Sequence, residues 1–428
     1  MHKTMSSSID NKKYKSVVFL AWAVHTVPHE TGAVGDPNGP GYVAGEYVGL
    51  DDPRKDLEER IQLVAAAADQ AYEMAVDTRE DPTILHCILI PEFFFRGKDG
   101  AYNACGDMGG SDHHALRDHG GELIRNLANQ AKYAHWLFVC GSVIESDIQS
   151  ASEEVKHKAQ NRNDLLMAIV KAYNLAKDDE TKNFIFDLLD KSTTFAQSHS
   201  LETVRNRCYI YKQNWPEWPQ GVVIEKKYVS HEDFVLDYYS GNVYSEMNVA
   251  YPYVDESKGE LKKDANDEKS IFQLDGIMLA LEICLDHRRG RLRQVRKVDQ
   301  ESNVPIDLHL IVSCGMQIQQ PSVVAKTGGL VFNCDGEYAV CGEDEAPDTK
   351  SSIWTGTHDG KAHSQMTVVS KEANDNKNQD AICEMPKNVS VKTALFAPPK
   401  GLNIDQLEAY GGGEIHMYSN HPLPSWER

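Results

Sequence analysis

The segment TILHCILI, residues 83–90, is the strongest indication of the fold, because almost every side chain in it is apolar. Successive residues of a strand point to opposite faces, so an unbroken apolar run predicts a strand that is buried on both faces. Such strands are typical of parallel sheets with both faces covered. The run ends at Pro91-Glu92, which puts a carboxylate at the end of a buried strand.

Further strand-like runs lie on both sides of this one, and helical patterns separate the early ones. Residues 53–76 carry apolar side chains at helical spacing, with Pro53 in the first turn, and residues 112–134 predict a second helix. Strands dominate later and no unit repeats, so we expect one layered α/β domain with insertions. The other expected strands are 16–24, 136–144, 203–212, 221–229, 276–285, 306–313 and one that starts at 330.

The polarity of the chain divides it into three parts. Residues 1–14 are polar and predict a flexible N-terminus. We expect the domain to cover residues 15–345, with insertions at about 146–200 and 236–269. Residues 346–428 show no strand or turn spacing that can be placed and are interpreted as a C-terminal extension packed on the domain.

The composition is that of an ordinary globular protein, with 41% apolar and 25% charged residues among 428. The 44 Lys and Arg against 64 Asp and Glu give a formal charge of −20, so we expect no nucleic-acid partner. No apolar run approaches the roughly 20 residues that span a bilayer, and we expect no membrane association. The nine cysteines include no Cys-x-x-Cys pair, which favours a reducing compartment and a cytoplasmic protein.

Three reactive groups stand where strongly apolar strands end: Glu92, the pair Lys226-Lys227, and Cys284. Loops at strand ends are where layered α/β folds usually build their sites. Three phenylalanines follow Glu92, and poorly solvated surroundings raise the pKa of a carboxyl group toward that of a general base. Each residue alone has a simpler explanation, as an exposed loop acid, an edge-strand lysine or a buried small thiol.

Cys284 differs from most of the nine cysteines in its neighbours. Glu282, Asp286 and His287 lie within three residues of it, and two arginines follow. A thiol among ionisable groups at a strand end is a candidate nucleophile.

Taken in this order, the three strand ends resemble the nitrilase, or carbon–nitrogen hydrolase, superfamily. Its pattern is a Glu in a PE strand end, a Lys at a later strand end, and a Cys in an I-C-x-D/E strand end. The resemblance covers roughly residues 16–340. Its supporting context is the strand at 16–24, Cys140-Gly141-Ser142, Val204-Arg205-Asn206 and the strand at 307–313.

The resemblance implies an α/β fold of the nitrilase-like kind, a four-layer α-β-β-α sandwich, here with inserted helical and loop segments. It also implies a Glu-Lys-Cys triad. Cys284 would attack an amide or nitrile carbon and form a thioester, and Glu92 would move the protons. The lysine and the backbone N–H of Leu285 would hold the tetrahedral anion.

Two positions of this pattern stay open. Lys226 is preferred over Lys227, because the residues two before and three after it are apolar, as in the family. The two lysines point to opposite faces of the strand, so both cannot serve. A second acid follows the lysine in many members, and Asp233 is preferred over Glu232 for that position.

We expect the substrate to lie between the loop after Glu92 and the turn that follows residue 313, with the glycine-rich loop 32–49 at the border. His287, where many members carry Arg, and Glu282, where apolar residues are usual, depart from the family pattern and affect the substrate more than the chemistry. The expected substrate-binding residues are Phe93, Leu285, His287, Ser313 and Gly315.

The sequence therefore predicts a thiol hydrolase that cleaves a non-peptide carbon–nitrogen bond, most simply a linear amide. Nitrile or N-carbamoyl hydrolysis would use the same triad, and a nitrilase-like binding or scaffold protein without catalysis is a further alternative. We expect no cofactor and no metal, because His113, His114 and His119 do not match the common zinc spacings. We also expect a homodimer or a higher homo-oligomer, since nitrilase-like domains commonly pair.

Overall fold

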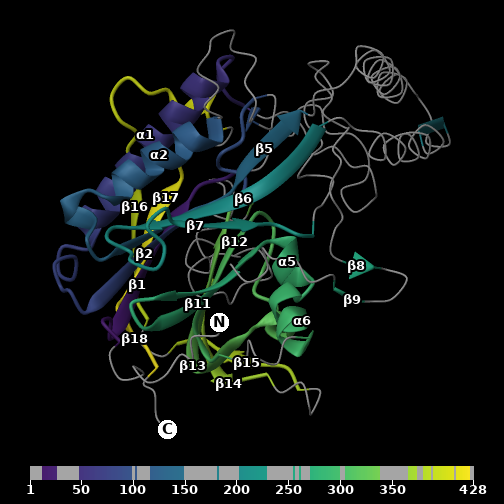
Figure 1. Cartoon of the computed structure of the whole chain (residues 1–428). Coiled ribbons are helices and arrows are strands. Elements are labelled where there is room, and N and C mark those ends of the chain that lie inside the picture. The colour runs from purple at the N-terminus through teal and green to yellow at the C-terminus, as the bar shows by residue number, and fades with distance from the viewer. Residues whose placement is uncertain are drawn as a thin grey trace.

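The fold comes from a computed structural model, and it is mixed α/β with two open sheets and few helices (Figure 1). Most of the expected insertions, about 146–200 and 236–269, lie outside the residues that the structure describes. The structure describes residues 12–26, 48–98, 102–103, 116–148, 181–182, 202–228, 254–255, 260–261, 270–298, 304–337, 365–373, 379–386, 389–408 and 411–424.

The run at residues 83–90 forms strand β2 (Ile84–Ile90), in which every residue is buried. It lies parallel between β1 and β4, as its two-sided apolar pattern predicts. The strand order of this first sheet is β16-β17-β1-β2-β4-β6-β5-β3, and β18 and β7 pair with β1 and β6. The other strands are β1 (Ser16–Ala23), β3 (Tyr102–Asn103), β4 (Trp136–Cys140), β5 (Val143–Ile148), β6 (Glu202–Lys212), β7 (Val222–Glu225), β16 (Val391–Leu395), β17 (Glu414–Tyr418) and β18 (His421–Pro422).

The second sheet has the order β10-β11-β12-β13-β14-β15. Its central strands β11, β12 and β13 are parallel, and β12 is buried along its whole length. A separate two-stranded sheet joins β8 (Val254–Asp255) and β9 (Glu260–Leu261). The strands of the second sheet are β10 (Ile271–Leu274), β11 (Ile277–Ile283), β12 (Ile306–Ser313), β13 (Ala325–Asp335), β14 (Gln365–Lys371) and β15 (Ile382–Glu384).

Two longer helices, α1 (Pro53–Met74) and α2 (Leu116–Ala128), lie side by side over one face of the first sheet (Figure 1). The Asp52 side chain caps α1 by accepting hydrogen bonds from the first-turn N–H groups. The helix expected at 112–134 is shorter, because it ends at Ala128 and a short 3-10 turn follows. The shorter helices α5 (Leu285–Arg288) and α6 (Arg291–Val298) lie beside the second sheet.

Alternation along β1 explains why this strand is apolar on both faces. Val18, Leu20 and Trp22 belong to the core shared with α1, whereas Val17 and Phe19 belong to the core between the two sheets. In that second core the Phe19 ring stacks on the Phe332 ring of β13, with the ring centres 4.4 Å apart. On the other face of the second sheet, side chains of β11 and β12 pack against Leu292 of α6.

Both ends of the expected domain differ from the structure. Residues 12–14 were expected to be flexible, but they pack on the domain: the Lys12 ammonium is 2.8 Å from Asp307, and Tyr14 is buried. The rest of the expected flexible segment lies outside the described residues. At the other end, β14 pairs with β13, and β17 and β18 pair with β1. Residues beyond 345 therefore complete both sheets, so that position is no boundary between a domain and an extension. Strand β16 gave little apolar signal because it lies at the sheet edge and is mostly exposed.

Among the described helices, none is long and apolar enough to span a membrane. The seven described cysteines are all free thiols: Cys87, Cys140, Cys208, Cys284, Cys314, Cys334 and Cys383.

Candidate active site

Three strand ends bring Glu92, Lys226 and Cys284 together. Glu92 follows β2 and is fully buried, and Lys226 follows β7. The Lys226 ammonium donates to Glu92 Oε1 at 2.9 Å, and Nδ2 of Asn206, on β6, donates to the same oxygen at 2.9 Å. Cys284, at the end of β11, has a thiol that donates to the carbonyl oxygen of Cys314 at 3.7 Å and lies close enough to Glu92 for that charge to raise its pKa. An acid, a cation and a thiol thus share one buried place.

The surroundings of Cys284 keep its thiol protonated. Burial raises the pKa of Cys284 well above its ordinary value, and the negative charge of Glu92 raises it further, while Lys226 lowers it. The thiol is therefore the resting form at neutral pH, and it needs a neighbouring base to become a nucleophile. Glu92 is in place to be that base.

The turn after β4 holds the Glu92 loop in position. Gly141 has φ +54°, and a Cβ at this position would lie 2.2 Å from the carbonyl oxygen of Pro91. Next to it, Ser142 Oγ accepts a hydrogen bond from the backbone N–H of Phe93 at 3.0 Å. On the other side, the Thr26 hydroxyl donates to the carbonyl oxygen of Glu92 at 2.6 Å. Only glycine permits the close approach of residue 141 to Pro91. Ser142 then supplies the hydrogen bond to the Glu92 loop.

Backbone strain accompanies two of the predicted site residues. Phe93 has φ 65° and Cys284 has φ 42°, in the region where side chains with a Cβ are unfavourable. Strain of this kind persists only where the surroundings impose it, and it gathers at functional sites.

The structure separates the two candidate lysines. Lys226 contacts Glu92 and lies over the Phe93 ring, 5.6 Å from its centre. The Lys227 ammonium instead lies 3.6 Å from Glu225. Both lysines are buried, and the alternation of side chains explains why only one of them reaches Glu92.

Asp286 links the end of β7 to helix α5. Its carboxylate accepts from the backbone N–H groups of Lys227 and Tyr228, at 2.9 Å and 2.7 Å, and lies 3.2 Å from the Arg291 guanidinium. Burial raises the pKa of Asp286 to about 6, although Arg291 lowers it. This carboxylate therefore holds the Lys226 segment next to the Cys284 turn.

The expected substrate-binding residues differ in their surroundings. Leu285 begins α5 directly after Cys284, and Phe93 lies beside Lys226. Ser313 is buried and its hydroxyl donates to Asp335 at 2.7 Å, while the backbone N–H of Gly315 donates to the same carboxylate at 2.9 Å. Ser313 and Gly315 thus shape the turn that follows β12. Asp233, Glu232 and residues 27–47 of the glycine-rich region lie outside the described residues.

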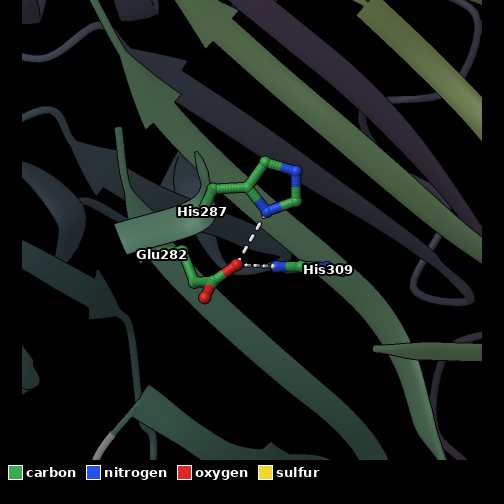
Figure 2. A group of neighbouring side chains, drawn as sticks. All are labelled: Glu282, His287 and His309. Atoms are coloured by element: carbon green, nitrogen blue, oxygen red, sulfur yellow. Dashed lines mark hydrogen bonds and ion pairs between the residues drawn. The ribbon is translucent and has the colours of Figure 1, made fainter. Parts of the chain in front are cut away.

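His287 does not face a substrate, in contrast to the role expected for it. Its ring is fully buried and its Nδ1 lies 2.7 Å from Glu282 Oε2 (Figure 2). Its Nε2 accepts the backbone N–H of Gln319 at 2.9 Å. Both ring nitrogens are engaged, so the imidazole has none left for a ligand.

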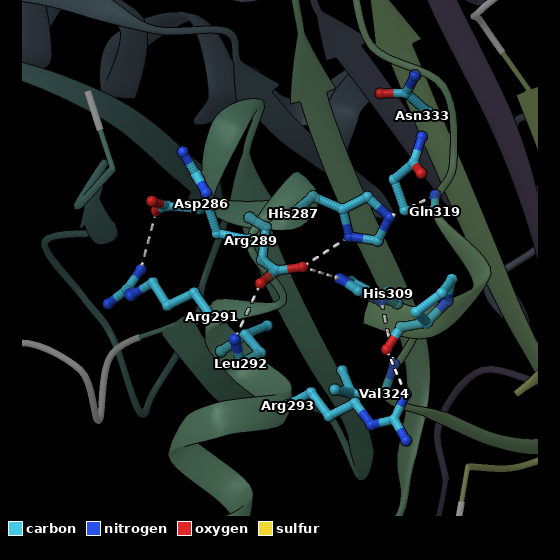
Figure 3. Close-up of polar contacts among 12 residues, drawn as sticks. Asp286, His287, Arg289, Arg291, Leu292, Arg293, His309, Gln319, Val324 and Asn333 are labelled. Atoms are coloured by element: carbon cyan, nitrogen blue, oxygen red, sulfur yellow. Dashed lines mark hydrogen bonds and ion pairs between the residues drawn. The ribbon is translucent and has the colours of Figure 1, made fainter. Parts of the chain in front are cut away.

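A second histidine completes this buried group, which we call the Glu282 network: Glu282, His287 and His309. His309 Nε2 of β12 lies 3.0 Å from the same oxygen, Glu282 Oε2, and its Nδ1 accepts the backbone N–H of Val324 at 3.4 Å (Figure 3). Glu282 Oε1 accepts the backbone N–H of Leu292 at 2.9 Å. All three side chains are fully buried.

The two backbone donors determine which ring nitrogens carry protons. Since backbone N–H groups can only donate, His287 must be protonated at Nδ1 and His309 at Nε2, and both rings are neutral. Burial alone would raise the pKa of Glu282, but the hydrogen bonds from the two rings outweigh it and lower that pKa. The network is therefore one carboxylate charge surrounded by neutral donors.

The same protonation argues against a metal ion in the Glu282 network. The three possible ligand atoms lie within 4.8 Å of one another. A neutral histidine that gives one nitrogen to a metal carries its proton on the other. Here the other nitrogens of His287 and His309 accept from backbone N–H groups. If a metal were bound, each of these nitrogens would carry a proton that points at a backbone N–H proton, and the hydrogen bonds would be lost. The group suits hydrogen bonding and not a cation.

Some site residues were missed in the sequence because their partners are distant. His309 and Asp335 were not singled out, and Asn206 only through the family resemblance. The available signal was that His309 lies inside an apolar strand, where a buried polar group requires a partner. Its partner Glu282 lies on another strand, and only the pairing of β11 with β12 brings the two together.

Comparison with known proteins adds no further assignment: no protein-family model matches the chain, and no curated protein sequence is significantly similar to it.

Proposed function

We propose that this protein is a thiol hydrolase of the nitrilase type, which cleaves a non-peptide carbon–nitrogen bond with Glu92, Lys226 and Cys284. One observation carries the proposal. The buried Lys226 ammonium lies 2.9 Å from the buried Glu92 carboxylate, and the charge of that carboxylate acts on the nearby Cys284 thiol. Burying charged groups costs desolvation free energy, and clusters of such groups are typical of functional sites. Here three charged or reactive groups come together from three separate strand ends.

The packing of the layers supports a nitrilase-like four-layer α-β-β-α sandwich. Helices α1 and α2 share a core with one face of the first sheet. The other face shares a core with the second sheet, and α6 packs on the far side of that sheet. In such a sandwich, Glu92 and Lys226 come from the first sheet and Cys284 from the second.

The first half of the proposed reaction forms a thioester. Glu92 takes the proton of the Cys284 thiol while the sulfur attacks the amide carbonyl carbon, and a tetrahedral anion forms. The carbon–nitrogen bond then breaks, and Glu92 gives its proton to the leaving nitrogen. Ammonia or an amine departs, and the acyl group stays on Cys284.

The second half returns the enzyme to its starting state. Glu92 takes a proton from a water molecule, whose oxygen attacks the thioester carbon. The carbon–sulfur bond breaks, the acid departs, and the sulfur regains its proton from Glu92. The lysine and the Leu285 N–H would stabilise the anion in both halves, since fixed donors act strongly in a buried site.

The amide is proposed as the substrate class because it needs no step beyond these. Nitrile and N-carbamoyl substrates remain alternatives with the same triad. A non-catalytic binding protein is the contrasting possibility, and it predicts no activated thiol.

Limited alkylation with iodoacetamide tests the proposal. We expect intact mass and peptide mapping to show one early adduct at Cys284, absent in Cys284→Ala and at least about tenfold slower in Glu92→Gln, because the base is lost. Cys383→Ala is the matched control, since Cys383 is also partly exposed but lies on β15, and it should leave the Cys284 rate unchanged.

Labelling spread over several cysteines, with Cys284 unreactive, would contradict the hydrolase and favour a binding protein. Selective labelling would be followed by a panel of linear amides, nitriles and N-carbamoyl compounds, with release of ammonia or amine as the readout.

A further inference from the structure

We propose that the Glu282 network positions the nucleophile: Glu282, held by His287 and His309, sets the turn that directs Cys284 toward Glu92. This inference rests on the proposed function, because it gives the network a role in that site. Glu282, His287 and His309 are positioning residues and do not touch the substrate.

The geometry of β11 shows why the turn needs support. Leu281 and Ile283 point into the core between the sheets, whereas Ala280 points to the opposite face, toward α6. Strict alternation would place Cys284 on the α6 face, with Ala280 and Glu282. The Cys284 side chain instead packs against the core between the sheets and interacts with Glu92.

The backbone at Cys284 produces this reversal. Its φ of 42° and ψ of −106° end the strand and start α5. A residue with a Cβ adopts this conformation only when its surroundings impose it. The strand pairing supplies one constraint, because the Cys284 N–H donates to the carbonyl oxygen of Val312 at 2.9 Å.

The Glu282 carboxylate supplies constraints on the far side of the turn. One oxygen holds His287, three residues beyond Cys284, and the other holds the N–H of Leu292 at the start of α6. His309 fixes the same carboxylate to the neighbouring strand β12. A chain loop from Cys284 to Leu292 is thereby tied back to the strand from which it leaves (Figures 2 and 3).

Charge makes these ties strong. Hydrogen bonds to an ionised carboxylate are about twice as strong as those between neutral groups. Three donors surround Glu282, and each ring is oriented by a backbone donor on its other nitrogen. Removing one ring leaves a buried charge with fewer donors, and the turn loses its anchor.

The contrast between His309→Gln and His309→Leu tests the inference. Glutamine can donate to Glu282 and accept from Val324, as the neutral ring does, whereas leucine fills similar space without either bond. The measurement is the factor by which Glu92→Gln slows alkylation of Cys284 by iodoacetamide, determined in each background. This factor reports contact between the thiol and Glu92, and a loss of overall stability alone would not change it.

We expect a factor of at least about ten in the parent chain and in His309→Gln, and no more than about two in His309→Leu. The alkylation rate of Cys383 on β15 should be the same in all backgrounds and shows that the fold is intact. A factor of ten or more in His309→Leu would overturn the positioning role while the hydrolase proposal stands.

Absence of selective Cys284 labelling in the parent chain would instead overturn the proposed function, and the positioning role with it. If His309→Leu does not fold, Glu282→Gln decides, because it keeps the shape and places an amide donor against the existing donors. The factor should fall to about two there as well, and a value near ten would overturn the inference.

Discussion

Glu92 and Glu282 are both fully buried carboxylates next to the same cysteine, yet their surroundings differ. Glu92 faces a cation, Lys226, and an amide, Asn206, and its side chain also meets the thiol of Cys284. Glu282 faces two neutral imidazoles and one backbone N–H. The first arrangement leaves a carboxylate next to a group that can exchange a proton with it. In the second arrangement, neutral N–H donors occupy the carboxylate with hydrogen bonds and do not transfer their protons to it.

Burial alone therefore does not suit a carboxylate to proton transfer. The donors of Glu282 keep it ionised, since they lower its pKa, and they connect it to three parts of the chain. It is thereby suited to hold structure. Glu92 is suited to move protons because its neighbour is a thiol whose pKa burial has raised.

Substitutions at the proposed catalytic residues should have the largest effect, which is a loss of activity. Once a substrate is found, Cys284→Ala should abolish turnover, and Glu92→Gln should lower kcat by about 10²- to 10⁴-fold through loss of the proton carrier. Release of ammonia or amine is the readout. A Glu92→Gln enzyme within twofold of the parent would remove Glu92 from the mechanism.

The next prediction compares the two lysines, Lys226 beside Glu92 and Lys227 beside Glu225, by the stability lost when each is removed. Lys226→Met removes the buried cation beside Glu92 and should cost about 3–5 kcal/mol in the free energy of unfolding, because a buried charge loses its partner. Lys227→Met is the matched control and should cost less, since Glu225 is partly exposed. Urea unfolding measures both. Equal losses would show that the two lysines are not distinguished by Glu92.

A smaller loss of stability and activity is expected from a substitution that displaces the Glu92 loop and leaves Glu282 in place. Gly141→Ala should destabilise the protein by about 1–3 kcal/mol and lower activity, because a Cβ collides with Pro91 and displaces the Glu92 loop. Gly401→Ala is the control: its φ is +94°, but nothing lies within 4 Å of its Cβ position. Gly401→Ala should lower the free energy of unfolding by only about 1–2 kcal/mol, because alanine is unfavourable at a positive φ, and it should leave kcat unchanged. Loss of activity in both variants would contradict a local effect at Glu92.

The smallest effect is the pH dependence of the Glu282 network. The pKa of His309 is lowered by burial in the folded state, so its contribution to stability is complete above its ordinary pKa of 6.5 and is lost as the pH falls through the folded-state pKa. The lowered pKa of Glu282 gives a contribution that is complete above its ordinary 4.5 and is lost at still lower pH.

His309→Gln removes the first contribution and keeps the second. Its free energy of unfolding should therefore fall less than that of the parent between pH 7 and pH 5, as measured by urea unfolding at fixed salt. Parallel curves for the two proteins would show that His309 does not titrate in this network.

The residues that meet at the candidate site could be picked out because they lie at the ends of apolar runs. The run at 83–90 led to Glu92, and the run at 276–285 led to Cys284, because strand burial is a local pattern. The apolar residues two before and three after Lys226, which resemble the nitrilase pattern, favoured Lys226 over Lys227, and the contact with Glu92 agrees with that choice. His287 was misassigned because its partners, Glu282 and Gln319, come from a buried network that local spacing does not reveal.

The two-sided burial of the central strands and the reactive residues at their ends follow from the sequence alone, since both depend on the order of neighbouring side chains. Which of those residues meet depends on how the strands pack in three dimensions. The strands β14 and β17, which come after residue 345, join the sheets by backbone hydrogen bonds, which any side chain permits. The turn at Cys284 departs from strand alternation, and its direction depends on a carboxylate held by a histidine from another strand.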